Sequence, residues 1–267
     1  MFKDITLGQY YPVDSPVHRL DPRTKLAGTL IYIISLFIAG NIWGYAFSTI
    51  FLLLCIRESR VPLGYMFRGL KAILFILLFS VAFNLFLTPG EELFSVWKLT
   101  VTKEGLVQAF YMGVRLITLI MGTSLMTFTT TPTSLTDGLE RGLGFLKLVK
   151  VPVHEIAMMI SIALRFIPIL AEETDKIMKA QMARGADFET GNVIARAKAL
   201  VPLLVPLFIS AFRRATELAM SMEARCYHGG EGRTKMHPLK YEKGDFTAYA
   251  IFFIYLACCI LLKIFAK

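Results

Sequence analysis

Two arginines, Arg184 and Arg225, stand in nearly the same local pattern, each directly after an alanine at the end of a long amphipathic segment. A guanidinium group keeps its charge and offers several donors in a rigid fork, which suits binding to carboxylates and carbonyls of another protein. One such residue has a local explanation, because a cation at a helix C-terminus offsets the helix dipole by about 0.3–1 kcal/mol. Two in the same pattern favour a pair of docking sites. The candidate docking residues are Ala183, Arg184, Gly185, Ala224, Arg225 and Cys226.

The other residue patterns that could do chemistry are incomplete. The glycine-rich run at 229–232 lacks the spacing and the lysine of a phosphate-binding loop, so we expect no ATP hydrolysis by this chain. His154 and Glu155 begin like the helix of a zinc protease, but Met158 stands where the second histidine ligand belongs. The four cysteines have no metal-ligand spacing. The sequence therefore predicts no catalytic residue, no metal and no cofactor bound by this chain itself.

Several single residues are candidates for structural or partner-facing roles. Arg115 lies inside an apolar run, where it either supports a surface that meets a partner or is satisfied by carbonyls or by a polar group such as Asn84. Arg165, with Pro168, either reaches the bilayer edge or shapes a helix crossing. Flexible methionines suit both a helix crossing and a partner that changes position. These methionines are Met158, Met159, Met178, Met182, Met220 and Met222.

The composition is that of an integral membrane protein. The chain has 267 residues, 55% hydrophobic and 18% charged, with a mean hydropathy of +0.57. Its net charge of +9 does not indicate a nucleic-acid partner, because the basic residues flank apolar runs and do not alternate with base-stacking aromatics. The first 25 residues contain no apolar core of a signal peptide, so we expect the N-terminus to stay in the cytoplasm.

Apolar runs predict five membrane spans. The first run, Leu26–Ile56, is interpreted as a hairpin that turns at Gly40 and Asn41. A single helix of that length would place the basic residues at its two ends on opposite sides of the membrane, against the positive-inside tendency. The remaining spans are expected over 72–87, 106–128 and 247–265. Five spans place the N-terminus inside and the C-terminus outside.

The sequence changes character between the fourth and fifth spans. Residues 131–246 carry 16 Lys/Arg and 13 Asp/Glu, which argues against lipid exposure over most of this segment. The periodicity predicts a short helix over 132–147 and two long amphipathic helices over 152–184 and 193–225, kinked by internal prolines. Small residues near the C-terminal ends of the long helices predict that the helices cross there.

The expected protein is therefore an all-α integral membrane protein with a cytoplasmic module of two crossing helices and one shorter helix. Its expected parts are a cytoplasmic segment 1–25, transmembrane helices in 26–130, the cytoplasmic module 131–246 and a last transmembrane helix in 247–267.

Four short strings, in sequence order, resemble the transmembrane T component, or scaffold subunit, of energy-coupling factor (ECF) vitamin transporters. They are HRLDPRTK at 18–25, RFIP at 165–168, QMARG at 181–185 and MEARCY at 222–227. The resemblance implies a scaffold in a prokaryotic cell membrane that links two cytoplasmic ABC-type ATPases, which bind ATP and Mg, to a small membrane subunit that binds a vitamin or another micronutrient. It also implies that Arg184 and Arg225 each dock in a groove of one ATPase.

Cys226 departs from the family pattern, in which glycine is usual at this position. Because cysteine need not adopt the left-handed backbone that glycine permits, the sequence leaves open whether the second motif turns like the first.

Two other function classes are weighed. A stand-alone channel or carrier would carry intramembrane charges and paired broken helices, of which only Arg115 is clear. A membrane-embedded lipid or prenyl transferase would need clustered carboxylates, and the pairs Glu91-Glu92 and Glu172-Glu173 form no paired-aspartate metal motif.

Overall fold

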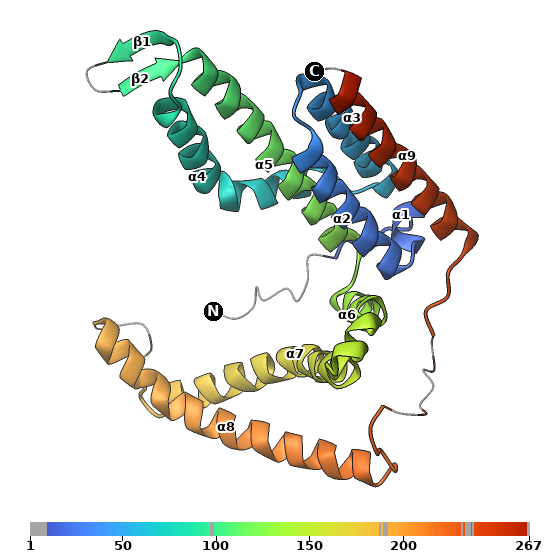
Figure 1. Ribbon diagram of the computed structural model, residues 1–267. Helices are drawn as coiled ribbons and strands as arrows, with labels where there is room; N and C mark the ends of the chain where they lie inside the picture. Colours follow the sequence, from blue (N-terminus) through green and yellow to red (C-terminus); the bar gives the residue numbers. More distant parts are fainter. Residues whose placement is uncertain are drawn as a thin grey trace. The chain divides into compact units, whose positions relative to one another are not determined.

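The computed structural model describes residues 10–96, 99–186, 188, 192–230, 232, 236 and 238–265, which fall into two compact units (Figure 1). The first unit, here called the membrane bundle, comprises Gly8–Gly138 and Leu239–Lys267. The second, here called the helical module, comprises Leu139–Pro238.

The membrane bundle is built from helices that follow the apolar runs of the sequence. In chain order its elements are α1 (Pro16–Arg19), α2 (Pro22–Ile38), α3 (Ile42–Ser59), α4 (Leu63–Leu87), β1 (Glu92–Val96), β2 (Leu99–Thr102), α5 (Lys103–Thr129), the first part of α6 (Pro132–Gly142) and, after the helical module, α9 (Lys243–Phe265). The break between α2 and α3 confirms the predicted hairpin at Gly40 and Asn41.

The connection between α4 and α5 holds the one element type that the sequence did not indicate. β1 and β2 pair antiparallel, with an irregularity between Glu92 and Phe94, so the predicted external loop contains a short hairpin (Figure 1). Thr102 closes this hairpin and begins α5, because its hydroxyl accepts a hydrogen bond from Gly105 N at 3.1 Å. The other regular elements of the described residues are helices, as expected.

The core of the bundle is a buried aromatic and hydroxyl cluster where α2, α3 and α9 meet. The Tyr255 ring stacks on Phe51, with ring centroids 4.1 Å apart. The Tyr255 hydroxyl lies 2.6 Å from Ser35 Oγ and donates to Ser48 Oγ at 2.9 Å. Buried hydroxyls need partners, and these three supply one another within an apolar bundle.

Arg115 of α5 is held by an aromatic neighbour within the bundle. Its Nε donates to Tyr45 Oη at 2.9 Å, and its guanidinium lies 5.5 Å from the centre of the Phe37 ring. The expectation that a polar group satisfies Arg115 is therefore confirmed, but that group is Tyr45 and not Asn84, whose amide donates to Ser80 O of its own helix. An ionisable side chain inside an apolar segment is thus satisfied by a tyrosine of the neighbouring helix α3.

The helical module contains η1 (Gly144–Val149), α7 (Val153–Ala183) and α8 (Val193–Glu223). The two long helices match the predicted ranges closely, and Pro168, Pro202 and Pro206 lie inside them as predicted. Glu173 pairs with Arg214 at 2.8 Å, and Gln181 Nε2 donates to Pro202 O at 3.4 Å. Gln181 follows Glu173 on α7, whereas its partner Pro202 precedes Arg214 on α8. The two helices therefore run antiparallel.

This direction corrects one expectation. The small residues near both C-terminal ends predicted that α7 and α8 cross there, but the C-terminal part of α7 contacts the N-terminal half of α8 at Pro202. The C-terminal end of α8 lies on the side of the start of α7 (Figure 1). Beyond that end, Gly230 packs against His154, the second residue of α7. Small side chains permit a close crossing but do not by themselves select the partner surface.

Five described helical segments are long and apolar enough to cross a membrane. They are α3, α5, α7, the part of α8 from Ala199 to Glu223, and α9; α4, bent by 65° between Lys71 and Ile73, would make a sixth. The number agrees with the expected five, but the membership differs. The expected set held α2, which at 17 residues is at the short limit for a span, and α4, and it did not hold α7 and α8.

Candidate functional site

The first candidate site is the C-terminal end of α7. There Gly185 N donates to Met182 O and Ala186 N donates to Gln181 O, each at 3.0 Å. These two bonds form a Schellman motif, in which a left-handed residue after the helix turns the chain and satisfies the last carbonyls. Gly185 is that residue, with φ at +89°, and Arg184 directly precedes it.

The second candidate site is the C-terminal end of α8, and it repeats the first bond for bond. Cys226 N donates to Glu223 O at 2.9 Å, and Tyr227 N donates to Met222 O at 3.0 Å. Cys226 takes the left-handed position, with φ at +56°, and Arg225 directly precedes it.

The second motif therefore turns in the same way as the first, which the sequence alone left open. Cysteine occupies the left-handed conformation that Gly185 occupies in the first motif, although an L side chain disfavours it by about 1 kcal/mol. The backbone around Arg225 therefore follows the same path as the backbone around Arg184. The likeness of the two motifs in sequence extends to their hydrogen bonds.

Both motifs present their arginine outward. Arg184 and Arg225 are exposed, as are Ala183, Gly185, Ala224 and Cys226. The two arginines are also well separated, since Gln181 lies beside Pro202 and Arg225 follows Pro202 by 23 residues (225 minus 202). At 1.5 Å per residue, that length of helix is about 35 Å. Two separate partner subunits could bind these ends at once.

The crossing of α7 and α8 is fixed by few contacts and leaves a large apolar surface uncovered. The window of α7 with span-like hydropathy is only 11% buried, and that of α8 only 6%. Phe208 is 67% exposed and Phe212 62%. Exposed apolar surface of this extent marks a site that meets lipid or another protein.

The methionines and the other predicted residues divide between this surface and the crossing. Met182 and Met220 are exposed, whereas Met178 and Met222 are half-buried. Arg165 is exposed on α7, and Pro168 interrupts the same helix one turn later. Arg115 belongs to the other unit, the membrane bundle.

The string at 18–25 forms a compact junction at one end of the bundle. Asp21 caps α2 by accepting from Arg23 N at 2.9 Å, and its carboxylate also pairs with the Arg23 guanidinium at 2.9 Å. Asp245, at the start of α9, accepts from Asp21 N at 2.8 Å. The junction therefore ties the beginning of α2 to the beginning of α9.

Lys25 extends this junction to two more helices. Its ammonium group donates to His18 O at 2.9 Å, in α1, and to Thr129 O at 2.8 Å, the last residue of α5. A cation at these positions satisfies carbonyls that have no partner inside their helices and opposes the negative ends of the helix dipoles. Lys25 is only 7% exposed, so it acts as an internal cap and not as a surface charge.

His18 completes the junction on the side of the N-terminal segment. Its Nδ1 lies 2.7 Å from Ser15 Oγ, and its Nε2 lies 3.0 Å from Tyr11 O. The neutral ring with its proton on Nε2 fits both contacts, since it donates to the carbonyl and accepts from the serine hydroxyl. Burial lowers the pKa of His18 below its ordinary value of 6.5, with Lys25 contributing in the same direction.

The sequence analysis identified residues 18–25 only as a string that resembles the family, and it did not predict the contacts that these residues make. The available signals were Ser15 and Asp21, each directly before a proline that can begin a helix. No sequence signal connects Lys25 with Thr129 or Asp21 with Asp245, because those pairs are distant in the chain.

Comparisons with known proteins identify relatives over nearly the whole length. The family model described as Cobalt transport protein, CbiQ, matches residues 14–236. A protein of Clostridium kluyveri named energy-coupling factor transporter transmembrane protein EcfT is 54% identical over 267 aligned residues, covering 99% of this chain and 98% of the relative. Proteins of the same name from Bacillus subtilis and Lactococcus lactis are 48% and 42% identical, covering 97% and 91% of this chain and 98% and 92% of the relatives.

Proposed function

The chain belongs to the CbiQ family, and from this membership we propose that it is the transmembrane scaffold of an energy-coupling factor importer. In this role it joins two cytoplasmic ABC-type ATPase subunits to a small membrane subunit that binds a vitamin or another micronutrient. The relatives bear the name of the transmembrane component of such a transporter.

The observation that carries the proposal is the repeated helix end. Two exposed arginines stand on Schellman turns of equal geometry, at sites separated along α8 by about 35 Å of helix. Each guanidinium would bind in a groove of one ATPase, where a charge-assisted contact with a carboxylate or a carbonyl resists sliding. A pair of similar ATPases is the partner that two similar contacts fit best.

The ATPases would supply the energy. Their closing and opening would shift Arg184 and Arg225 relative to each other and so change the angle between α7 and α8. The uncovered apolar faces of these helices would lie along the cytoplasmic side of the membrane and contact the micronutrient-binding subunit. The chain would then act without a substrate pathway of its own, which distinguishes this proposal from a stand-alone channel or carrier.

We place the chain in the cell membrane of a prokaryote, with the N-terminus inside and the C-terminus outside. The supporting pattern is the basic residues before α2 and after α3, which a hairpin puts on one side. In this orientation both arginine tips face the cytoplasm.

The test is co-purification and uptake with charge-reversed tips. We expect Arg184→Glu and Arg225→Glu each to weaken retention of one ATPase or to uncouple ATP hydrolysis from uptake, because each variant places a carboxylate where the partner binds a cation. The full complex would be isolated in detergent, and micronutrient uptake would be measured in liposomes with ATP inside.

Arg213→Glu is the matched control, because it makes the same charge change at an exposed site on α8 away from the tip. Normal assembly and uptake in the Arg184→Glu, Arg225→Glu double variant would refute the proposal. Uptake by the chain alone, without ATPases, would favour the channel or carrier class.

A further inference from the structure

Two adjoining cavities enter the membrane bundle at the end where α1 lies. The outer one, about 450 Å³, is lined mostly by charged and polar residues, and we call it the vestibule. The inner one, about 510 Å³, is lined mostly by apolar residues, and we call it the groove. They share the lining residues Pro16, Leu20 and Gly244, so one continues into the other. Both volumes lie in the range of about 300–1,000 Å³ that is typical of sites for small molecules.

The groove runs between four helices and opens to the side. Residues of α2, α3, α5 and α9 line it, and most of them are apolar. The charged exceptions are Lys25, whose ammonium donates to two carbonyls, and the exposed Glu58 near the end of α3. The rings of Phe51 and Phe252 meet at 6.3 Å and bring α3 and α9 together. Leu54 and Ile251, which also line the groove, are each 54% exposed, so its rim reaches the lateral surface of the bundle. In a membrane, this opening faces the acyl chains of the lipid.

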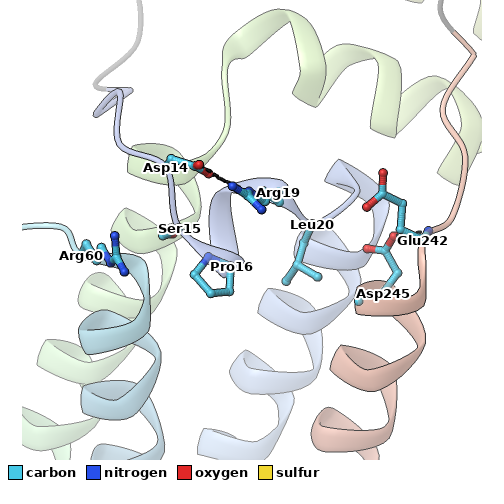
Figure 2. A pocket seen from close by; sticks show the side chains of 9 residues that line it. Asp14, Ser15, Pro16, Arg19, Leu20, Arg60, Glu242 and Asp245 are labelled. Carbon is cyan, nitrogen blue, oxygen red and sulfur yellow. Dashed lines mark hydrogen bonds and ion pairs between the residues drawn. The ribbon is translucent and has the colours of Figure 1, made fainter.

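The vestibule carries charges of both signs around a central floor. Figure 2 shows Arg60 at the end of α3 on one side, and Glu242 and Asp245 at the start of α9 on the other. Leu20 and Pro16 lie between them.

Most of these charges already have partners. Arg19 Nε donates to Asp14 Oδ1 at 2.7 Å, in an exposed ion pair. Asp245 accepts from the backbone of Asp21 at 2.8 Å and of Glu242 at 2.9 Å, which satisfies both of its oxygens. Within the described part of the chain, the side chains of Arg60 and Glu242 form no ion pair and no hydrogen bond. One cation and one anion, on opposite sides of the vestibule, are therefore available to a ligand.

We infer that the vestibule and the groove form one binding site for a zwitterionic phospholipid with an ammonium head group, of the phosphatidylethanolamine class. An acyl chain would fill the groove from the side, where lipid reaches it. The Arg60 fork would bind the phosphate, and the Glu242 carboxylate would accept from the ammonium. The order of the features, apolar inside and charged at the mouth, matches the order of tail and head in the lipid.

Lipid selectivity tests the inference. The full-length chain would be reconstituted in nanodiscs with equal amounts of phosphatidylethanolamine and phosphatidylglycerol, extracted into detergent, and its retained lipid measured by native mass spectrometry. We expect phosphatidylethanolamine to be retained about tenfold over phosphatidylglycerol, the ratio that one favourable ionic contact gives. Equal retention of the two lipids, a preference for phosphatidylglycerol, or no retained lipid would overturn the inference.

Variants separate the two parts of the site. Thr247→Phe fills the groove from α9 and should reduce all lipid retention, whereas Ala250→Phe, an exposed position on the same helix outside the groove, should not. Glu242→Gln should abolish the preference for phosphatidylethanolamine while keeping a lipid bound. Unchanged retention in Thr247→Phe, or an unchanged preference in Glu242→Gln, would contradict the site. Assembly with the ATPases is a separate measurement, so this result does not depend on the proposed function.

Discussion

At the scale of single residues, the most informative position is Cys226, since it adopts a backbone conformation that favours glycine. We expect Cys226→Gly to stabilise the protein by about 0.5–1 kcal/mol, because it removes the steric cost of a left-handed side chain. Chemical unfolding in detergent measures this change. Gly185→Ala is the reverse experiment at the matching position and should destabilise by about 1 kcal/mol. A loss of stability in Cys226→Gly would mean that the thiol makes a compensating contact.

Lys25 offers a second prediction at this scale. Replacing it by methionine keeps the length of the side chain but leaves the carbonyls of His18 and Thr129 without their buried donor, so we expect destabilisation by about 2–3 kcal/mol. Thermal unfolding of Lys25→Met should show a clear decrease in Tm. Lys243→Met, at an exposed position at the start of α9, is the control and should change little. Equal effects of the two substitutions would exclude a capping role.

His18 predicts a dependence of stability on pH. Its pKa in the folded protein is below the ordinary value of 6.5, so the unfolded chain binds the proton more readily. The contribution of His18 to stability is therefore complete above pH 6.5 and is lost as the pH falls below that value. We expect Tm to fall between pH 7 and pH 5 by less in His18→Gln than in the unmodified protein, when both are measured in the same detergent. If the two proteins show the same dependence of Tm on pH, His18 is not the cause of the decrease.

What the sequence could predict at this scale was local. Arg184 and Arg225 were recognisable because each follows an alanine at the end of an amphipathic pattern, and a helix end needs only its own neighbours to form. The Tyr45 partner of Arg115 was not predictable, because several polar groups of the bundle were equally plausible until the helices were placed in contact.

At the scale of elements, the pairing of α7 with α8 is the central feature, and one ion pair reports on it. We expect Glu173→Arg to weaken this pairing and Arg214→Glu, added to it, to restore part of the loss. Because both side chains are partly exposed, the coupling should be about 0.5–1 kcal/mol. A double-mutant cycle on unfolding free energies measures it, and a cycle without coupling would contradict the antiparallel pairing at this point.

The sequence predicted the lengths of these helices but not their direction of crossing. Their periodicity and end signals are properties of each segment alone, whereas the crossing depends on which surfaces fit together. Residues such as Ala215 and Ala219 are small, but the side chains of Gln181 and Glu173 on α7 contact Pro202 and Arg214 of α8. The hairpin between α2 and α3 was predictable because Gly40 and Asn41 interrupt an otherwise apolar run.

At the scale of the whole molecule, the proposed orientation makes a labelling prediction. Cys226 is exposed, whereas Cys55 and Cys258 are partly buried and Cys259 is buried. A membrane-impermeant maleimide should label Cys226 only after cells are opened, and Cys226→Ser should remove this signal. A cysteine introduced as Glu91→Cys, at an exposed position next to the hairpin, should react in intact cells. Labelling of Cys226 in intact cells would show that the orientation is the reverse of the proposed one.

The antiparallel pairing of α7 and α8 has a mechanical consequence. Since α7 contacts α8 at Pro202 and again at Arg214, the end of α8 from Arg214 to the tip at Arg225 behaves as a lever arm beyond the crossing. A sideways push at Arg225 with Arg184 held in place produces torque and not translation. Rotation of this kind would swing the short end of α8, from Val193 to Pro202, in the opposite sense and over a smaller arc.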